Sequence, residues 1–183
     1  MAATSTAIRP EPAQQSSRTA VWPEARFRVP AANALPRSVR VISLNDSDVD
    51  VAMSRARGAR PHVVFSGPAD FRALMGENAF DRRTDAAGCM SPVQRRRLRD
   101  WLGTPDLVLI VGDEADDPAL GILAAHEYPS HSITISGLIR RSAVSASNDS
   151  STSNALRPLC SMIVLVNDNG YLDDMLDALG AKE

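Results

Sequence analysis

The segment DLVLIVG (residues 106–112) constrains the fold of this chain more than any other stretch. Its apolar residues form an unbroken run instead of alternating with polar ones, which indicates a strand that is buried on both faces. Such strands lie at the centre of parallel sheets, because the helical crossovers between parallel strands cover both faces. The segment therefore predicts a parallel sheet flanked by helices.

The rest of the chain alternates strand-like and helix-like segments, as an α/β domain requires. We expect a three-layer, Rossmann-like domain with a mainly parallel sheet of about five strands. The expected strands lie at 39–44, 61–67, 106–112 and 132–139 and towards the end of 155–169, and the expected helices lie at 48–58, 69–76, 91–103, 116–127 and 171–181.

Local signals predict where helices begin and which faces they bury. Asp48 and Ser91 are expected to cap two helices, and Gly103 is expected to end the second of them. Apolar residues at spacing i, i+3, i+4 and i+7 predict the buried faces of the first and last helices. These residues are Val49, Ala52, Met53 and Ala56 in the first helix, and Leu172, Met175, Leu176 and Leu179 in the last.

Composition divides the chain into a tail and one domain. Residues 1–37 are rich in Ala, Pro, Ser and Arg without a helix or strand period, so we expect a disordered tail. Residues 38–183 are expected to form a single α/β domain, with a flexible polar loop at 141–154. The tail lacks the apolar core of a signal peptide.

Charge and cysteine usage exclude several classes of function. The net charge of −2 provides no global field that would attract nucleic acid. The chain has no apolar run of about 18 residues, so we expect no membrane partner. Cys89 and Cys160 lack the spacing of a zinc site or a disulfide framework, which favours a reducing, cytoplasmic setting. The frequent Ala and Arg fit a bacterial coding style.

Ligands of open parallel sheets bind beyond the carboxyl ends of the strands. The residues expected there are the candidate ligand-binding residues, although phosphate would require glycines that let backbone N–H groups approach it. No glycine-rich phosphate motif occurs in the chain, and no pair of histidines has metal-ligand spacing. The candidates are Asn45, Asp46, Ser66, Gly112, Asp113 and Asp116.

The acidic loop GDEADD (residues 112–117) has three interpretations. Asp116 and Asp117 precede Pro118, and carboxylates at a helix start stabilise it by roughly 0.5–2 kcal/mol. Helix capping is therefore favoured over a Mg²⁺ or ligand site, and over acid–base catalysis.

Five segments resemble, in order, the GTPase domain of the FtsZ/tubulin family. The first segment is similar to the family's first strand and nucleotide loop, and the second to its second strand. The third is similar to the helix, strand and phosphate-binding segment that follow. The fourth and fifth are similar to the next strand and to the last strand. The segments are VRVISLNDSDVDVAMSRA (39–56), HVVFSGPADFRAL (62–74), RLRDWLGTPDLVLIVGDEADDPALGILAAHE (97–127), SITISGLI (132–139) and LRPLCSMIVLVNDNGYL (156–172).

The resemblance implies a nucleotide-binding fold that has lost its glycine-rich loops. Residues 45–48 stand in place of the first such loop, and residues 112–118 in place of the GGGTG(T/S)G loop. The chain ends at Glu183, before the family's long core helix, catalytic acidic loop and second domain. The resemblance therefore implies a truncated pseudo-GTPase that binds GTP weakly or not at all.

Two functions follow from these observations. The first is a non-enzymatic, FtsZ-like binding or scaffolding domain without a cofactor, which contacts another protein through its sheet edge, last helix or tail. The alternative is an enzyme or switch that binds a nucleotide such as GTP, or a phosphosugar, through Mg²⁺ held by Asp46, Asp113 or Asp116. No catalytic residue can be assigned for either function.

Overall fold

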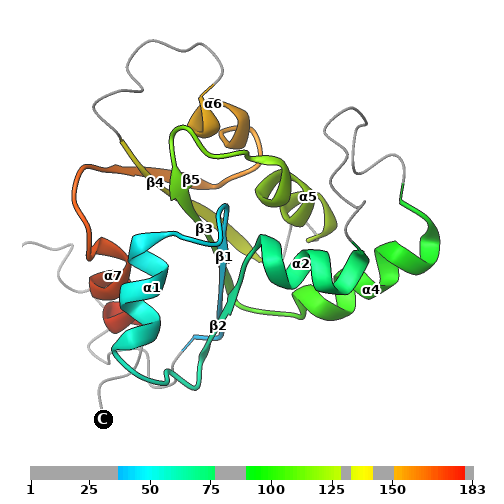
Figure 1. The fold of residues 1–183 in the computed structure, drawn as a ribbon, viewed down its shortest axis with the longest axis horizontal. Coiled ribbons are helices and arrows are strands. Elements are labelled where there is room, and N and C mark those ends of the chain that lie inside the picture. The colour runs from blue at the N-terminus through cyan, green and yellow to red at the C-terminus, as the bar shows by residue number, and fades with distance from the viewer. Residues whose placement is uncertain (1–36, 77–89, 129–132, 142–150, 180–183) are drawn as a thin grey trace, which may run out of the picture. The chain divides into compact units, whose positions relative to one another are not determined.

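A computed structural model describes residues 37–76, 90–128, 133–141 and 151–179 (Figure 1). These residues form a five-stranded sheet in which all neighbouring strands are parallel, which confirms the expected α/β class. The strands are β1 (Val39–Ser43), β2 (Val63–Ser66), β3 (Leu107–Asp113), β4 (Thr134–Arg140) and β5 (Met162–Val166).

Helices cover both faces of the sheet. Two hydrophobic clusters, one on each face, contain the buried residues of the helices and thereby show which helix packs where. On one face lie α1 (Val49–Ala56) and α7 (Tyr171–Leu179); on the other lie α2 (Pro68–Met75), α4 (Pro92–Leu102), α5 (Ala119–Glu127) and α6 (Thr152–Leu156). The domain therefore has the three layers that the sequence predicts.

The strand order is β2-β1-β3-β4-β5, so β3 lies at the centre of the sheet. Its residues from Leu107 to Gly112 are all buried, as its unbroken apolar run predicts. β2 and β5 are the two edges of the sheet within the described residues. The order reverses between β1 and β3, and this is where doubly wound sheets form a crevice for ligands.

The first helix begins where the sequence predicts but buries a different face. The Val51 N–H donates to Asp48 Oδ1 at 3.0 Å, so Asp48 is the cap. The predicted apolar face was wrong, because Val49 and Met53 are exposed while Asp50, Val51 and Ser54 are buried. Polar contacts turn the helix this way: Gly170 N–H donates to Asp50, and Arg60 donates to Ser54.

Two other helices follow their sequence signals closely. In α4, Ser91 and Gln94 form a reciprocal capping box, and the helix ends at Gly103 as predicted. In α7, Leu172 and Leu176 are buried and their neighbours Met175 and Leu179 pack against the same cluster.

The polar segment 141–154 was predicted as a loop, but its last residues belong to a helix. Residues 142–150, and the tail residues 1–36, lie outside the described residues. Helix α6 begins at Thr152, with Ser151 as its cap, since the Asn154 N–H donates to the Ser151 hydroxyl.

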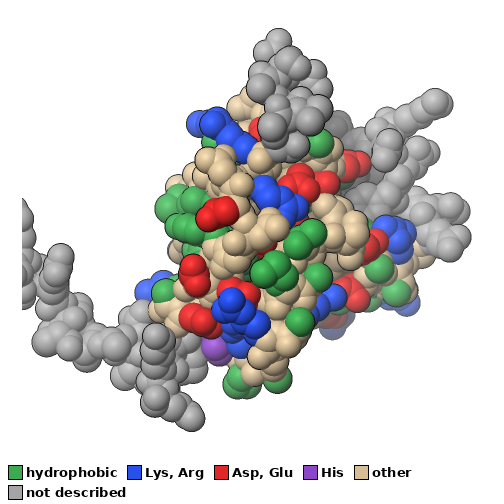
Figure 2. All heavy atoms as spheres, turned by 60° about the vertical axis from the view of Figure 1, so that its left-hand side comes forward, with side chains coloured by type: hydrophobic (Ala, Val, Ile, Leu, Met, Phe, Trp, Pro, Cys, Tyr) green, Lys and Arg blue, Asp and Glu red, His purple; other side chains and the backbone are tan. Residues whose placement is uncertain are grey.

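The face that carries α1 and α7 is held by ion pairs between the two helices and the turn before β2. Arg60 contacts Asp173 at 3.1 Å and Asp177 at 2.8 Å, and Arg57 contacts Asp173 at 3.1 Å. Figure 2 shows acidic, basic and apolar side chains interspersed on this side of the molecule, without a field of one sign.

Candidate functional site

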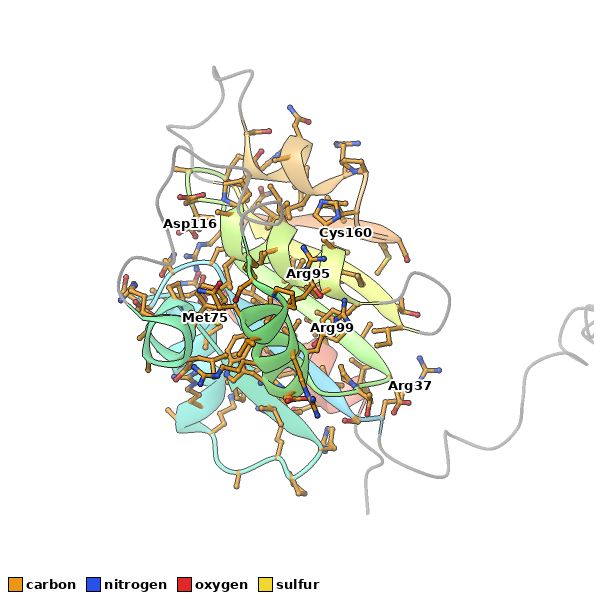
Figure 3. The ribbon with its side chains drawn as sticks, turned by 90° about the vertical axis from the view of Figure 1, so that its right-hand side faces the viewer. Arg37, Met75, Arg95, Arg99, Asp116 and Cys160 are labelled. Carbon is orange, nitrogen blue, oxygen red and sulfur yellow. The ribbon has the colours of Figure 1, made fainter. Side chains whose placement is uncertain are left out.

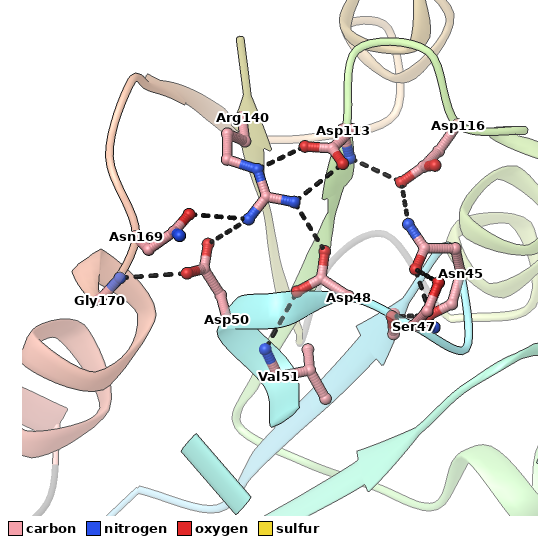
Figure 4. Close-up of polar contacts among 11 residues, drawn as sticks. Asn45, Ser47, Asp48, Asp50, Val51, Asp113, Asp116, Arg140, Asn169 and Gly170 are labelled. Carbon is pink, nitrogen blue, oxygen red and sulfur yellow. Dashed lines mark hydrogen bonds and ion pairs between the residues drawn. The ribbon is translucent and has the colours of Figure 1, made fainter. Parts of the chain in front are cut away.

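Four short segments follow the carboxyl ends of β1, β3, β4 and β5, and they lie together at that end of the sheet, which we call the ligand edge. β1 leads to α1 on one face and β3 leads to α5 on the other, so the loops 44–48 and 113–118 flank the switch point. The end of β4 at Arg140 and the turn 167–170 after β5 lie beside them (Figure 4). This edge is where a ligand of the fold would bind.

Arg140, at the end of β4, is the centre of the polar contacts here (Figure 4). Its guanidinium donates to both carboxylate oxygens of Asp113, at 2.6 and 2.8 Å. It also donates to Asn169 Oδ1 at 3.0 Å. A bidentate arginine–carboxylate pair is among the strongest polar contacts in proteins, so the end of β4 is tied firmly to the end of β3.

Two further carboxylates face the same guanidinium. Asp50 Oδ2 lies 3.4 Å from Arg140 Nη1, and Asp48 Oδ2 lies 3.9 Å from Nη2. The remaining oxygens accept backbone hydrogen bonds, from Val51 N–H to Asp48 and from Gly170 N–H to Asp50. We call Asp48, Asp50, Asp113, Arg140 and Asn169 the Arg140 cluster.

The charges of the cluster respond to burial and to each other. The pKa of Arg140 is raised above its usual value, because the guanidinium donates hydrogen bonds to Asp113. Burial raises the pKa of Asp48, although the Val51 N–H and Arg140 oppose this shift. The side chain of Asp48 is only 1% exposed, so it is held inside the protein and away from solvent.

Hydrogen bonds between side chains join the two loops that flank the switch point between β1 and β3. Asp116 Oδ2 accepts from Asn45 Nδ2 at 2.7 Å and from the Asp113 N–H at 2.6 Å. A Cβ on Gly112 would lie 2.8 Å from Asp116 Oδ2 and 2.9 Å from Leu44 Cβ. Gly112 is therefore needed so that the two loops can approach closely.

Asp46 and Ser66 are engaged elsewhere. Asp46 accepts from the Ala69 N–H at 2.7 Å and from Arg72 Nη2 at 2.8 Å, which ties the loop after β1 to the start of α2. Ser66 is buried, and its hydroxyl accepts from Arg40 at 3.0 and 3.2 Å. The structure thus brings together four of the six candidates, Asn45, Gly112, Asp113 and Asp116, and places the other two in separate contacts.

The two aspartates before α5 have different roles. The N-cap residue of α5 is Pro118, which makes no side-chain cap hydrogen bond, but the Ala119 N–H at the start of the helix donates to Asp117 Oδ1 at 3.0 Å. Asp116 instead turns back to bond the loop, and its carbonyl accepts from the Thr152 hydroxyl. The bond from Thr152 attaches α6 to the acidic loop.

The arginine run on α4 borders a surface hollow of about 470 Å³. Arg95 and Arg99, labelled in Figure 3, both pair with Glu127 of α5, at 3.1 and 2.8 Å. Their charges therefore join α4 to α5 and are partly neutralised. The hollow is lined by Met90, Pro92, Arg95, Arg96, Arg99 and Asp100.

Reasoning from the sequence did not identify Arg140, Asp50 or Asn169 as members of the site. One signal could have revealed Arg140: it is a basic residue at the end of a predicted strand, while the neighbouring strands end in acidic loops. Because parallel strands present their carboxyl ends at one edge, opposite charges there are expected to meet.

The fold and the site define a class of protein, a doubly wound α/β domain with strand order 2-1-3-4-5 in which polar side chains join the loops at the carboxyl ends of the strands. Comparisons with known protein families, curated proteins and solved structures find no significant match.

Within the described ranges, no group of three or more His, Cys, Asp and Glu side chains could hold a metal ion. None of the helices in this part of the chain has both the length and the apolar character needed to cross a membrane.

Proposed function

We propose that this chain is a non-enzymatic, protein-binding or scaffolding domain, derived from an FtsZ/tubulin-like nucleotide-binding fold. The observation that carries the proposal is that the protein's own carboxylates accept the backbone N–H groups at which a phosphate would bind. Asp48 accepts the Val51 N–H at the start of α1, and Asp117 accepts the Ala119 N–H at the start of α5. These backbone groups are the ones that bind phosphate in nucleotide-binding folds.

The electrostatics of the edge also oppose a phosphate ligand. Three carboxylates surround one guanidinium in the Arg140 cluster, and Asp116 adds a fourth carboxylate at the crevice. A phosphate would have to displace Asp48 from its cap and approach this negative group. Each of these steps costs free energy without an obvious compensating contact.

A magnesium-dependent or catalytic role would disrupt the same contacts. A Mg²⁺ ion at Asp113 would have to displace Arg140, which holds both carboxylate oxygens of that residue. Burial raises the pKa of Asp48, but its side chain is only 1% exposed and is not accessible to a substrate. These considerations favour a domain that acts through its outer surface.

The proposal retains the cytoplasmic, bacterial setting expected from the sequence. Cys160 is a free cysteine in the structure. Burial raises its pKa to about 11, so its thiol is a poor nucleophile at neutral pH.

Thermal unfolding of the full chain with GTP, GDP and ATP, each with and without Mg²⁺, tests the proposal. We expect the same melting temperature in every condition. A ligand at 100 times its Kd would add about 2.7 kcal/mol, which is readily measured. A saturable, nucleotide-specific rise would overturn the proposal.

Matched variants would then assign such a rise to a site. Loss of the rise in Asp113→Ala and in the milder Asp113→Asn, with retention in Asp100→Ala on the exposed surface of α4, would make the acidic loop a nucleotide site. Retention in all three variants would place the ligand elsewhere, and the proposal would still be wrong.

A further inference from the structure

The edge strand β5 has the composition of an interior strand. Its sequence, MIVLV, contains no polar or charged residue. Only Val166 is buried, while the three residues before it are partly buried and Met162 is 49% exposed. Within the described residues, β4 is its sole neighbour in the sheet, so the outer side of β5 has no paired strand there. Figure 1 shows β5 at the margin of the sheet.

The opposite edge strand is shorter than β5. β2 has only four residues, VVFS, and Arg55 of α1 lies over a face of the sheet there, 5.4 Å from the centre of the Phe65 ring. A short edge strand is one device by which monomeric proteins limit edge-to-edge pairing. β5 carries neither a charge nor a proline, and among the described residues no strand pairs with its outer side.

We propose that two copies of this chain associate through β5, so that the two sheets continue across a two-fold axis. This inference rests on the proposed protein-binding function and names its partner, which is a second copy. A two-fold interface requires a surface that is complementary to itself. The two β5 strands would run antiparallel, because a two-fold axis perpendicular to a sheet reverses the strand direction.

The sequence of β5 meets this requirement when Val164 lies on the axis. Met162 of one copy then faces Val166 of the other, and Ile163 faces Leu165, so every pair within the strand is apolar. The next pair outward is Ser161 with Asn167, which are polar and uncharged. No like charges meet directly across the axis, and like charges are what most destabilises cross-strand pairs.

The pairing is short, which sets its expected strength. β5 contributes five residues from each copy. We expect the surface area buried by such a pairing to be no larger than that of the smallest stable protein–protein interfaces, about 1,200 Å². We therefore expect a dimer that dissociates on dilution. Sedimentation velocity of the full chain over a wide range of protein concentrations should show a monomer–dimer equilibrium.

Two lysine substitutions provide a matched test. Met162→Lys places a charge in the interface, and Val64→Lys places one on the other edge strand at a site of nearly equal exposure, 50% against 49%. Met162→Lys should raise the dimer dissociation constant at least about tenfold, whereas Val64→Lys should leave it unchanged. Both variants should melt close to the unmodified chain, because both sites are half exposed. Equal effects, no effect of Met162→Lys, or a monomer at every concentration would overturn the proposal.

A cysteine on the axis tests the register independently. Directly opposed residues of antiparallel strands have Cα atoms about 4.5–5.5 Å apart, within the range that a disulfide spans. With Cys89 and Cys160 replaced by serine, Val164→Cys should form a disulfide-linked dimer under mild oxidation, and Val64→Cys should not. Equal dimer formation by both variants, or none by Val164→Cys, would contradict pairing about Val164.

The nucleotide titration separates the two proposals. A chain that is monomeric and insensitive to nucleotide removes the dimer but leaves the non-enzymatic assignment in place. A chain that dimerises through β5 and is also stabilised by a nucleotide retains the interface and removes the non-enzymatic assignment.

Discussion

β3 and β5 are both apolar strands of the same parallel sheet, yet their surroundings differ. β3 lies between β1 and β4, and every residue from Leu107 to Gly112 is buried. β5 pairs with β4 alone and is mostly only partly buried. The difference teaches that an apolar run predicts a strand but not its burial, which depends on what lies on each side. In β3 the apolar residues stabilise the core; in β5 we infer that they stabilise an interface.

The comparison predicts its largest effect in the core of β3. Ile110→Ala removes a fully buried side chain from the cluster on the α5 face and should lower the free energy of unfolding by about 2–5 kcal/mol. Met162→Ala in β5, measured at concentrations where the chain is monomeric, should cost less than about 1 kcal/mol, because half of that side chain is already in water. Urea denaturation measures both. Similar losses would show that β5 is as enclosed as β3.

Two glycines, Gly112 within β3 and Gly137 of β4 beside β5, sharpen the comparison. In Gly112→Ala, the new Cβ would meet Asp116 Oδ2 at 2.8 Å and Leu44 Cβ at 2.9 Å, so we expect a loss of about 1–3 kcal/mol. In Gly137→Ala on β4, the nearest atom is Ile163 Cγ1 of β5, at 3.2 Å. That side chain is only partly buried and can shift, so the loss should be smaller. A larger loss for Gly137→Ala would contradict a loosely packed β5.

The ion pair at the end of β3 should have an intermediate effect. Asp113→Ala leaves the Arg140 guanidinium without its bidentate partner and should cost about 1 kcal/mol, since both side chains are partly exposed to solvent. Arg140→Met in the same chain removes a cation that also faces the buried carboxylates of Asp48 and Asp50, so the double variant should be less stable than Asp113→Ala but should lose less than the sum of the two single losses. Chemical denaturation of the two single variants and the double variant gives the coupling. Strictly additive losses would mean that the pair contributes nothing to stability.

The smallest effect is expected at Asp48, where the change depends on pH. Asp48→Asn keeps an oxygen for the cap of α1 and should be nearly neutral at about pH 7. Burial raises the pKa of Asp48 in the folded state, so the fold binds a proton more readily than the unfolded chain. The stabilisation is present below the unfolded pKa and is lost as the pH rises through the folded pKa.

The difference in unfolding free energy between the unmodified chain and Asp48→Asn should therefore increase in favour of the unmodified chain from about pH 7 to about pH 4. Denaturation curves of both proteins at matched pH values measure this difference, and effects of the other carboxylates largely cancel. A difference that decreases on acidification would show that the hydrogen bond and Arg140 outweigh burial.

Local chemistry made much of the fold predictable. Asp48 caps α1 through Val51, and Ser91 caps α4 through Gln94, over separations of three residues. Such contacts depend only on residue types and spacing, because a helix start brings these atoms together whatever the rest of the chain does. The same holds for the unbroken apolar run of β3.

The buried face of α1 was not predictable in this way. Apolar spacing favoured burial of the helix face that carries Val49 and Met53. Instead, the face that carries Asp50 and Ser54 is buried, because both side chains accept hydrogen bonds there. The donor to Asp50 is Gly170, which is 120 residues away in the sequence. Burying two polar groups is favourable only because these distant partners are present.

The sequence alone determined the α/β class, the positions of the strands and most helix starts, because these depend on residues a few positions apart. The tertiary structure decided the strand order, the inward position of Arg140 and the edge position of β5. Arg140 reaches Asp113 and Asp50 across 27 and 90 residues, and such contacts form only when the sheet has brought the strand ends together. The same strand order leaves one side of β5 without a neighbour among the described residues, although its sequence matches that of a central strand.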